Sequence, residues 1–509
     1  MSEICVGSPD LKFDGLVGLA ARASRILVPE GPRGRIRESR RTIDQALSEG
    51  RTVYGVNTGF GKLSGVSIPE DQLAVLQKNL LLSHATGVGE LLSEDICRLA
   101  FGLRIHNLAL GFSGVRLELI ERMEGMFNAS MSPVMPSQGS VGASGDLAPL
   151  AHMALPLIGR GEVYHDGEVI TGQAALDRLG WAPLDLAAKE GLALINGTQV
   201  MTAIGLIALA RAIDLSKAAD IACAMTVEAL RGSDQPFAEA VHAVRPHEGQ
   251  RLTAANLRTL LESSEILLSH QECEKVQDAY SIRCAPQVHG AVKGALHHVM
   301  TVLVNEGNSV TDNPIVFSNG DVISAGNFHG QPVSQALDFL SIGISTLANI
   351  SERRTENLVN PDISGLPPFL AATPGIESGF MIPQVVAASL ASENKTLAHP
   401  ASVDTIPTSA NREDHVSMGV TAARHAMQIV VNTTNVIAIE CLCGAQGLDC
   451  GESLRPGKGV AQAYEVIRER VASLDSDRYL APDVKAIGDL LASGDLVRRV
   501  EEAVGELHS

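Results

Sequence analysis

The chemically distinctive part of this chain is the tripeptide Ala143-Ser144-Gly145, which lies inside the stretch GSVGASGDLAPLAH. Small residues flank the serine, and glycine has no side chain to keep its amide nitrogen away from a neighbouring carbonyl. In a tightly bent backbone the nitrogen of Gly145 can attack the carbonyl of Ala143 and close a five-membered ring. Loss of water and of the Ser144 hydroxyl then leaves an exocyclic methylene on an imidazolone. The tripeptide can therefore form a strong electrophile from protein alone, which no ordinary side chain provides.

Two other interpretations of this stretch compete with that chemistry. A segment rich in Gly and Ser is most often a loop, because glycine is used wherever the backbone needs a positive φ. A serine-hydrolase nucleophile elbow has the spacing G-x-S-x-G, which would require glycine at the position of Asp146. The spacing argues against the hydrolase, whereas the tripeptide taken alone is still compatible with a plain loop.

Composition limits the class of protein that can carry this tripeptide. Lys and Arg number 40 against 58 Asp and Glu, a net charge of −18, which argues against nucleic acid or an anionic membrane as partner. The eight cysteines have neither disulfide-framework nor zinc spacing, which indicates reduced thiols in a cytoplasmic protein and no metal site. The first residues lack the basic and apolar regions of a secretory signal.

Helical periodicity dominates the rest of the chain, and we predict a mainly α fold with a long central helical bundle. Several predicted helices exceed 20 residues and are apolar on more than one face, as expected at the centre of a bundle. The predicted helices span residues 36–50, 70–83, 92–110, 200–230, 254–268, 287–306, 332–358, 384–396, 412–442, 461–474 and 482–503. Small β-hairpins are predicted for residues 161–171 and 315–323, around Asp166-Gly167 and Asn319-Gly320.

The predicted organisation has three parts. Residues 1–195 form an N-terminal domain with the tripeptide, residues 196–445 the long-helix bundle, and residues 446–509 a C-terminal helical region. The uncharged stretch from Gly191 to Ala210 is long enough for a membrane span, but polar side chains interrupt it. We predict that it is a buried loop entering a core helix.

The stretch GSVGASGDLAPLAH closely resembles the signature of the histidine ammonia-lyase family, whose members form the 4-methylidene-imidazol-5-one group (MIO) from this tripeptide. The resemblance covers roughly residues 50 to 450 and includes the segments TVYGVNTGFGKL, QDAYSIRC, GNFHGQP and SANREDHVSM. It implies a fold of the fumarase/aspartase-like superfamily, and MIO as the cofactor with no external one. It also implies a homotetramer in which each active site draws residues from more than one subunit.

The resemblance gives catalytic roles to residues that alone would indicate packing or surface. Tyr54 and Tyr280 are implied as active-site tyrosines. A tyrosinate can remove the β-proton of an amino acid if its pKa, ~10 in water, is lowered by nearby positive charge or donors. We expect Tyr54 to be the base and Tyr280 to support it, with the reverse assignment open. Arg283 lies one helical turn after Tyr280 and is implied as the bidentate clamp for the substrate carboxylate.

Five further residues are implied to bind the substrate or the MIO group. Asn196 and Gln277 can donate or accept around the MIO carbonyl and the substrate amine, and Phe328 packs beside both. His84 and Glu413 match the positions that hold the imidazole ring. A carboxylate suits a ring with N–H donors and would be an unpaired buried charge beside a phenyl ring. The prediction is therefore elimination of ammonia from L-histidine to give trans-urocanate, the first step of histidine degradation.

Three residues depart from the family pattern beside substrate-contacting segments. Arg412 stands where glutamine is usual, Pro383 where a non-proline is usual, and Thr86 where a smaller residue or a thiol is usual. An arginine next to Glu413 would either neutralise it or supply charge for another substrate. An aminomutase, or a lyase for another amino acid, therefore remains an open alternative.

Two hypotheses from other classes fit less well. A non-catalytic scaffold would be expected to lose Tyr54, Ser144 or Arg283, and all three are present. A fumarase/aspartase-like enzyme would share the bundle but would need no Ala-Ser-Gly ring.

Overall fold

The computed structural model describes residues 3–271 and 276–509. The chain forms two compact units, each built from segments that are distant in sequence. The first unit comprises residues 1–207, 300–338 and 400–424. The second comprises residues 208–299, 339–399 and 425–509. These units interleave along the chain, whereas the predicted three-part division at residues 195 and 445 follows sequence order and stays a prediction.

The first unit is mainly helical, and its central helix α4 (Glu94–Ala109) is buried from Ile96 to its end. The other helices are α1 (Phe13–Gly18), α2 (Glu30–Ser48), α3 (Leu73–His84), α5 (Leu117–Asn128), α6 (Leu147–Ala154), α7 (Gly172–Leu179) and α8 (Glu190–Ile195). Short 3-10 helices occupy Gly61–Leu63, Glu70–Gln72 and Leu155–Ile158. Its apolar residues lie on several faces, and its buried arginines are hydrogen-bonded, Arg98 to the Phe127 carbonyl at 3.1 Å and Arg104 to Gln199 at 2.9 Å, so the helix can be covered on every side.

Four small sheets complete the first unit. Strand β1 (Glu3–Cys5) pairs in parallel with β2 (Arg25–Leu27), and β3 (Val88–Leu91) is antiparallel to β5 (Pro136–Gln138). The antiparallel order of the third sheet is β4 (Ser132–Pro133), β6 (Glu162–His165), β7 (Glu168–Thr171). The fourth is the hairpin of β8 (Ile315–Val316) and β9 (Val322–Ile323). Both predicted hairpins are confirmed, the first with its turn at Asp166 and Gly167, which have positive φ.

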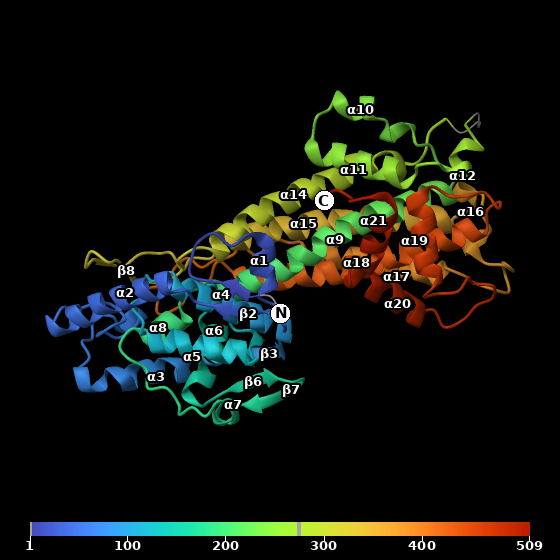
Figure 1. Ribbon diagram of the computed structural model, residues 1–509. Coiled ribbons are helices and arrows are strands. Elements are labelled where there is room, and N and C mark those ends of the chain that lie inside the picture. The colour runs from blue at the N-terminus through green and yellow to red at the C-terminus, as the bar shows by residue number, and fades with distance from the viewer. Residues whose placement is uncertain (1–2, 272–275) are drawn as a thin grey trace. The chain divides into compact units, whose positions relative to one another are not determined.

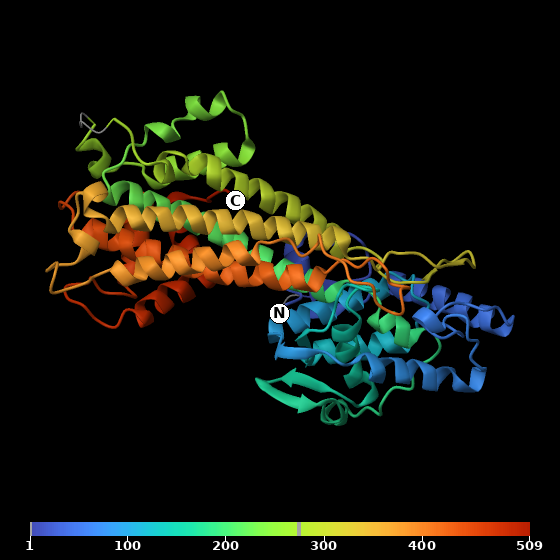
Figure 2. The ribbon, with the colours of Figure 1, turned by 180° about the vertical axis from the view of Figure 1, so that it is seen from behind.

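Four long helices run side by side through the second unit (Figures 1 and 2). They are α9 (Gln199–Ala229), α14 (Ala285–Gly307), α15 (Gln331–Val359) and α18 (Gly419–Asp449). The shorter helices are α10 (Glu239–Ala243), α11 (Glu248–Leu260), α12 (Glu265–Leu268), α13 (Tyr280–Arg283), α16 (Pro361–Ser364), α17 (Met381–Leu397), α19 (Lys458–Arg468), α20 (Ala481–Ala492) and α21 (Asp495–Val504). The 3-10 helices are Gln235–Phe237 and Pro368–Leu370. The mainly α fold with a long-helix bundle is therefore confirmed.

Several predicted helices were wrong in their extent. The helix predicted for residues 254–268 is broken between α11, which ends at Leu260, and α12, which begins at Glu265, and the one predicted for residues 461–474 ends at Arg468. The helix predicted for residues 482–503 is interrupted at Gly494, whose φ of +70° separates α20 from α21. The helix predicted for residues 412–442 begins only at Gly419, because the preceding segment forms a tight reverse turn. Glu413 therefore lies in this turn and not in the helix.

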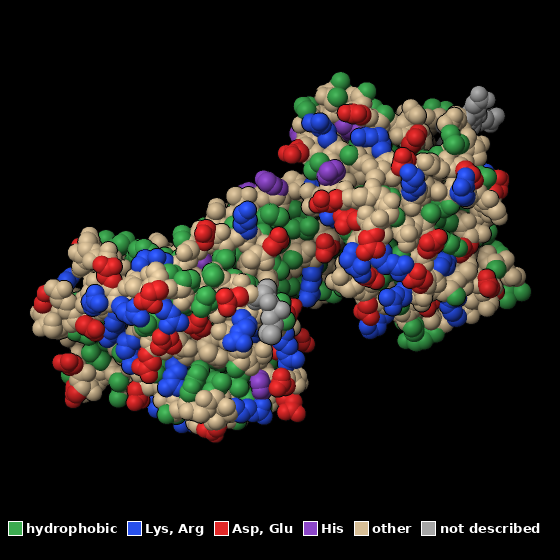
Figure 3. All heavy atoms as spheres, viewed as in Figure 1, with side chains coloured by type: hydrophobic (Ala, Val, Ile, Leu, Met, Phe, Trp, Pro, Cys, Tyr) green, Lys and Arg blue, Asp and Glu red, His purple; other side chains and the backbone are tan. Residues whose placement is uncertain are grey.

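The apolar helices are core helices. Helices α9 and α18 are long and apolar enough to cross a membrane, but their most apolar windows are 78% and 72% buried inside the protein. On the face drawn in Figure 3, acidic and basic side chains are interspersed over both units.

Candidate active site

The Ala143-Ser144-Gly145 tripeptide lies in a tight turn between β5 and α6. The residues that flank Ala143 and Ser144 close the turn, since Gly142 and Gly145 form an antiparallel bridge. Gly142, Ser144 and Gly145 have positive φ values of +82°, +50° and +78°. A positive φ is uncommon for serine and costs roughly 1–3 kcal/mol, so surrounding contacts must hold it. The bent backbone that ring closure requires is therefore present.

Neighbouring backbone fixes this turn from two sides. The N–H of Gly197 donates to the carbonyl oxygen of Ser144 at 3.2 Å, and the N–H of Asp146 donates to the carbonyl oxygen of Gly197 at 2.7 Å. A Cβ atom on Gly145 would lie 2.0 Å from that Gly197 oxygen, and one on Gly142 would lie 2.1 Å from Ser417 Oγ. Both positions therefore require glycine for space as well as for φ.

Asp146 connects the turn to the beginning of helix α9. Its Oδ2 accepts hydrogen bonds from the N–H groups of Val200 and Met201, each at 2.9 Å, and so caps that helix. Burial raises the pKa of Asp146 to about 7, although these donors act in the opposite direction. The carboxyl next to the tripeptide is thus an acid that titrates near neutral pH.

Tyr54 lies on a loop that packs against a small apolar core. Val53 and Val56 on either side of it are buried with Ile43, Leu73 and other residues of that core. A Cβ on Gly55, which has a φ of +70°, would lie 2.1 Å from Leu192, so the loop contacts α8 closely. The loop that carries the half-buried tyrosine is therefore anchored on both sides of it.

The side chains of Tyr54, His84, Ser144 and Glu413 converge on one cavity of about 740 Å³. Most of the remaining lining is apolar or backbone: Gly59, Phe60, Gly61, Lys62, Leu63, Val66, Ile68, Leu76, Asn79, Leu80, Ser83, Leu147, Leu192, Ile195, Ser409 and Ala410. An apolar cavity with a few converging polar groups is the usual form of a small-molecule site. Four of the predicted site residues, distant in sequence, are thus brought together.

The electrostatics of the cavity differ from the expectation for Tyr54. Burial raises the pKa of the phenol above its ordinary value, the Gly61 N–H lowers it, and the negative charge of Glu413 raises it again. For His84, burial lowers the pKa, while Glu413 raises it. A tyrosinate base was expected to need a nearby positive charge that lowers its pKa. Among the described residues, no cation has that effect on Tyr54. His84 is therefore neutral at pH 7, and Tyr54 is a protonated phenol.

Glu413 is presented by a reverse turn rather than by a helix. Thr408 and Glu413 pair through both backbone N–H groups, and Ser409, Ala410 and Asn411 between them have positive φ. The hydroxyl of Thr408 donates to Glu413 Oε2 at 2.6 Å. One carboxylate oxygen is thereby held, and in the described part of the chain no hydrogen bond holds the other.

Arg412 does not neutralise its neighbour. Its side chain is exposed, and no ion pair joins it to Glu413 in the described part of the chain. Thr86 is exposed just beyond α3. Pro383 is the third residue of α17, where helical N–H groups have no partner within the helix, so proline is tolerated there.

Asn196 is anchored by a buried polar cluster that the sequence analysis missed. Its Nδ2 donates to Asp312 Oδ1 at 3.2 Å and to the Asn313 carbonyl at 2.9 Å, while its Oδ1 has no partner. Asp312 forms an ion pair of 2.7 Å with Lys189, and both side chains are fully buried. Nothing local pairs residues 123 positions apart, so no sequence signal could have identified this anchor.

The remaining predicted residues do not line this cavity. Phe328 is half-buried in the turn before α15, and it is absent from the lining described above. Gln277, Tyr280 and Arg283 belong to the second unit, where Gln277 is exposed and Tyr280 is 72% exposed. The predicted helical turn is present there, since Arg283 Cζ lies 4.5 Å from the centre of the Tyr280 ring.

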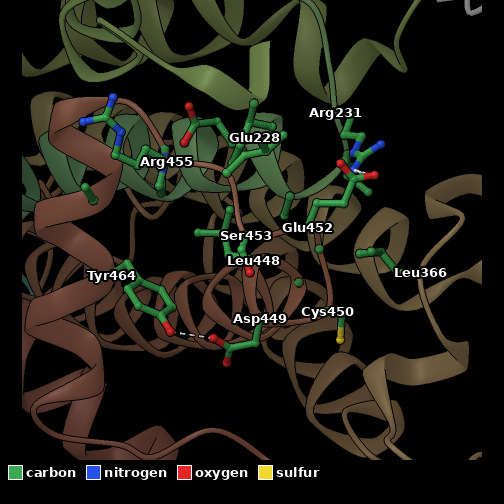
Figure 4. A pocket seen from close by; sticks show the side chains of 18 of the residues that line it. Glu228, Arg231, Leu366, Leu448, Asp449, Cys450, Glu452, Ser453, Arg455 and Tyr464 are labelled. Carbon is green, nitrogen blue, oxygen red and sulfur yellow. Dashed lines mark hydrogen bonds and ion pairs between the residues drawn. The ribbon is translucent and has the colours of Figure 1, made fainter. Parts of the chain in front are cut away.

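A larger cavity of about 1200 Å³ lies in the second unit at the ends of α9 and α18 (Figure 4). Two pairs of polar side chains face each other across its lining. Arg231 contacts Glu452 at 2.8 Å, and the Tyr464 hydroxyl donates to Asp449 at 2.5 Å. The cavity contains no predicted site residue, so we assign the chemistry to the smaller cavity around Ser144.

Comparison with known proteins agrees with this geometry. The model of the aromatic amino acid lyase family matches residues 11–469. A histidine ammonia-lyase from Alkaliphilus oremlandii (strain OhILAs) is 49% identical over 505 residues, which cover 99% of each chain.

Two solved structures have the same fold. The histidine ammonia-lyase from Trypanosoma cruzi superposes with a TM-score of 0.91 at 43% identity, covering 99% of this chain and 96% of that one. The tyrosine aminomutase from Streptomyces globisporus has a TM-score of 0.94 at 35% identity, covering 99% and 100%. This chain therefore belongs to the aromatic amino acid lyase family.

Proposed function

We propose that this chain is a histidine ammonia-lyase that eliminates ammonia from L-histidine to give trans-urocanate, the first step of histidine degradation. Relatives about 50% identical over the full length carry that activity in their names. The observation that carries the proposal is the cavity in which His84 and Glu413 face Ser144. Histidine has the imidazole N–H donors that a half-buried carboxylate needs as partners.

The tripeptide fits the electrophile that the family uses. Positive φ at Ser144 and Gly145, and the close approach of Gly197, bring about the bend that ring closure from Gly145 N to Ala143 C requires. The MIO group would supply an electron-poor methylene that captures electrons from the substrate and makes ammonia a better leaving group. Ser144 borders the cavity, so the group would face the substrate without a change in the fold.

The residues of the chain would then bind and deprotonate the substrate. Neutral His84 can donate to or accept from the imidazole ring, and the free oxygen of Glu413 can accept its N–H. Tyr54 is the proposed base for the β-proton. Because burial and Glu413 raise its pKa, the phenol must lose its proton to a group delivered with the substrate or by another chain.

We infer that Gln277, Tyr280, Arg283 and Phe328 enter the site from other copies of the chain in a homotetramer. Exposed Tyr280 supports this, as does the Nε of Arg283, which is buried without a partner. Apolar side chains on α15 and α17 are exposed as well: Phe339, Ile342, Ile382, Val385 and Val386. Such a face is typical of an interface between copies. Reduced cysteines and buried apolar helices favour the cytoplasm as its location.

The test is to supply the purified protein separately with L-histidine, L-phenylalanine and L-tyrosine. Ammonium release and urocanate formation from histidine, with little turnover of the other two, are expected. Chromatography of the products also detects β-amino acids, which an aminomutase would form. Turnover of tyrosine or phenylalanine without turnover of histidine would overturn the substrate assignment and favour the aminomutase alternative.

A further inference from the structure

Helix α13 carries both Tyr280 and Arg283 but consists of only four residues. A single helical turn has little stability of its own, because nucleation of a helix is unfavourable. Tyr280 is largely exposed, and the half-buried Arg283 has its Cζ 4.5 Å from the centre of the Tyr280 ring. Their orientation therefore depends on the contacts that the other face of α13 makes with the bundle.

Two side chains of α15 hold that other face through Ser281. Nδ2 of Asn357 donates to Ser281 Oγ at 3.0 Å. Nη1 of Arg354 points at the carbonyl oxygen of Ser281 at 3.4 Å. Ile282 beside it is 2% exposed and packs into the bundle. Residues 354 and 357 are three apart, so both side chains lie on one face of α15.

Arg354 is itself fixed by a fully buried carboxylate. Its Nε and Nη2 donate to Oε1 and Oε2 of Glu440 on α18, at 2.5 and 2.9 Å. Glu440 also accepts from the hydroxyls of Thr226 on α9 and Ser351, at 2.9 and 2.6 Å. Burial alone would lower the pKa of Arg354, but Glu440 raises it above its ordinary value. The guanidinium is thus charged, bidentate and immobile.

A histidine holds the guanidinium from the other side. His289 on α14 has its Nδ1 2.7 Å from Asp220 Oδ1 on α9, and its Nε2 3.1 Å from Arg354 Nη1. Burial lowers the pKa of His289, so the ring is neutral. Nδ1–H then donates to Asp220 and Nε2 accepts from Arg354. Helices α14 and α18 therefore hold Arg354 directly, and side chains of α9 and α15 hold it through His289 and Glu440.

We propose that Asn357 and Arg354 are positioning residues that set the orientation of α13, and through it the places of Tyr280 and Arg283 in the active site. The inference rests on the proposed function, which brings those two side chains to the substrate. A network serving only the bundle would be complete with Glu440, His289 and the hydroxyls. The bonds from Asn357 and Arg354 to Ser281 add nothing to the contacts between the long helices, so their consequence is the placement of α13.

The expected effect is larger on catalysis than on stability. One lost neutral hydrogen bond has a small effect on folding. A displacement of about 1 Å in a substrate-positioning group, by contrast, reduces the rate roughly 100-fold. A positioning role for Asn357 therefore predicts a large loss of activity with little loss of thermal stability in the same variant. A purely structural role predicts that the two fall together.

The experiment compares Asn357→Ala with the matched control Asn394→Ala in the full-length enzyme. Asn394 is buried on α17, where its Nδ2 donates to Thr433 Oγ1 at 3.1 Å and its Oδ1 accepts from Asn432 at 3.0 Å. It has no hydrogen bond to α13 in the described part of the chain. We expect Asn357→Ala to lower kcat/KM for histidine about 10- to 100-fold with a Tm no lower than that of the control. Near-ultraviolet absorbance of the electrophile, which forms in the first unit, should be unchanged.

Two further measurements make the proposal specific. Histidine methyl ester lacks the charged carboxylate, so its weaker turnover should fall much less in Asn357→Ala than the turnover of histidine. Ser281→Ala and the double variant Ser281→Ala/Asn357→Ala should lose no more than Asn357→Ala alone, because the two groups form one bond.

Equal kcat/KM for Asn357→Ala and Asn394→Ala, or additive losses in the double variant, would overturn the inference. Failure of the wild-type enzyme to release ammonia from histidine would instead overturn the proposed function, so the two failures can be told apart.

Discussion

The cavity around Ser144 and the surface around α13 both carry residue types suited to lyase chemistry. They differ in enclosure, in the pKa shifts of their side chains and in backbone conformation. In the cavity, Tyr54, His84 and Glu413 converge, the pKa values of Tyr54 and His84 are shifted by burial, and the backbone is held at positive φ. At α13, Tyr280 is exposed, and neither it nor Arg283 lines a cavity among those described.

The difference shows what each region lacks. Among the described residues, the cavity has Ser144 and the proposed ring-binding pair. No arginine lines it, and Lys62, which does line it, is not among the groups that lower the pKa of Tyr54. The α13 surface has an arginine and a second tyrosine. Hydrogen bonds from Arg354 and Asn357 to Ser281 hold this helix against the bundle. Under the proposed function, the two regions would be complementary halves of one site, each contributed by a different copy of the chain.

The largest expected effect is that of Ser144→Ala. Alanine has no hydroxyl to eliminate, so the electrophile cannot form and turnover should fall by more than about 10⁴-fold. The fold should survive this small change in a loop, with a nearly unchanged Tm. Turnover near that of the wild type would show that the reaction does not need an electrophile made from Ser144.

Shared sites can be tested by mixing two inactive chains. Ser144→Ala and Arg283→Ala are each expected to be inactive as pure proteins. When they are co-expressed, about a quarter of the sites should combine an intact cavity with an intact α13, if copies mix at random. Ammonia release that stays at background in the mixed tetramer would mean that both halves belong to the same chain.

Tyr54→Phe should lower kcat by about 10²–10⁴-fold while the electrophile still absorbs, because only the proton acceptor is lost. Tyr280→Phe should be milder. Comparison of the two kcat values assigns the base. A greater loss for Tyr280→Phe would move that role to α13.

Glu413→Gln should cost about one to two decades in kcat/KM for histidine, because a charge-assisted hydrogen bond is worth ~1.5–3 kcal/mol. Phenylalanine turnover should not improve. The neighbouring Arg412→Gln serves as the control and should change kcat/KM by less than about twofold, since its side chain is exposed and unpaired with Glu413. A large gain in histidine turnover for Arg412→Gln would show that Arg412 does reach the ring-binding pair.

The smallest effect concerns pH and Asp146. Its folded-state pKa of about 7 lies above the ordinary 3.8, so the folded state keeps a proton that the unfolded chain loses between these values. The contribution of Asp146 to stability is therefore present below pH 4 and is lost as pH rises to 7. Asp146→Asn should reduce the fall in Tm between pH 5 and pH 8 by a few degrees. An unchanged fall would mean that the carboxyl is ionised in the folded protein.

Several features of this protein followed from local sequence. The chemistry of Ala143-Ser144-Gly145 needs only three adjacent residues, and the turn at Asp166-Gly167 needs only two, so neither depends on distant contacts. The pairing of Tyr280 with Arg283 likewise needed only one helical turn. The long apolar helices were predictable because burial on several faces leaves a pattern within each helix.

The tertiary structure decided the rest. Glu413 lies in a reverse turn because Thr408 pairs with it across residues of positive φ, which outweighs the helical periodicity of the following segment. The pKa of Tyr54 rises rather than falls because burial and Glu413, 359 residues away in sequence, act on it. Gly145 must be glycine because Gly197 lies against it, and Asn196 is fixed by an ion pair between Lys189 and Asp312. Burial and charge depend on neighbours in space, and no local pattern encodes them.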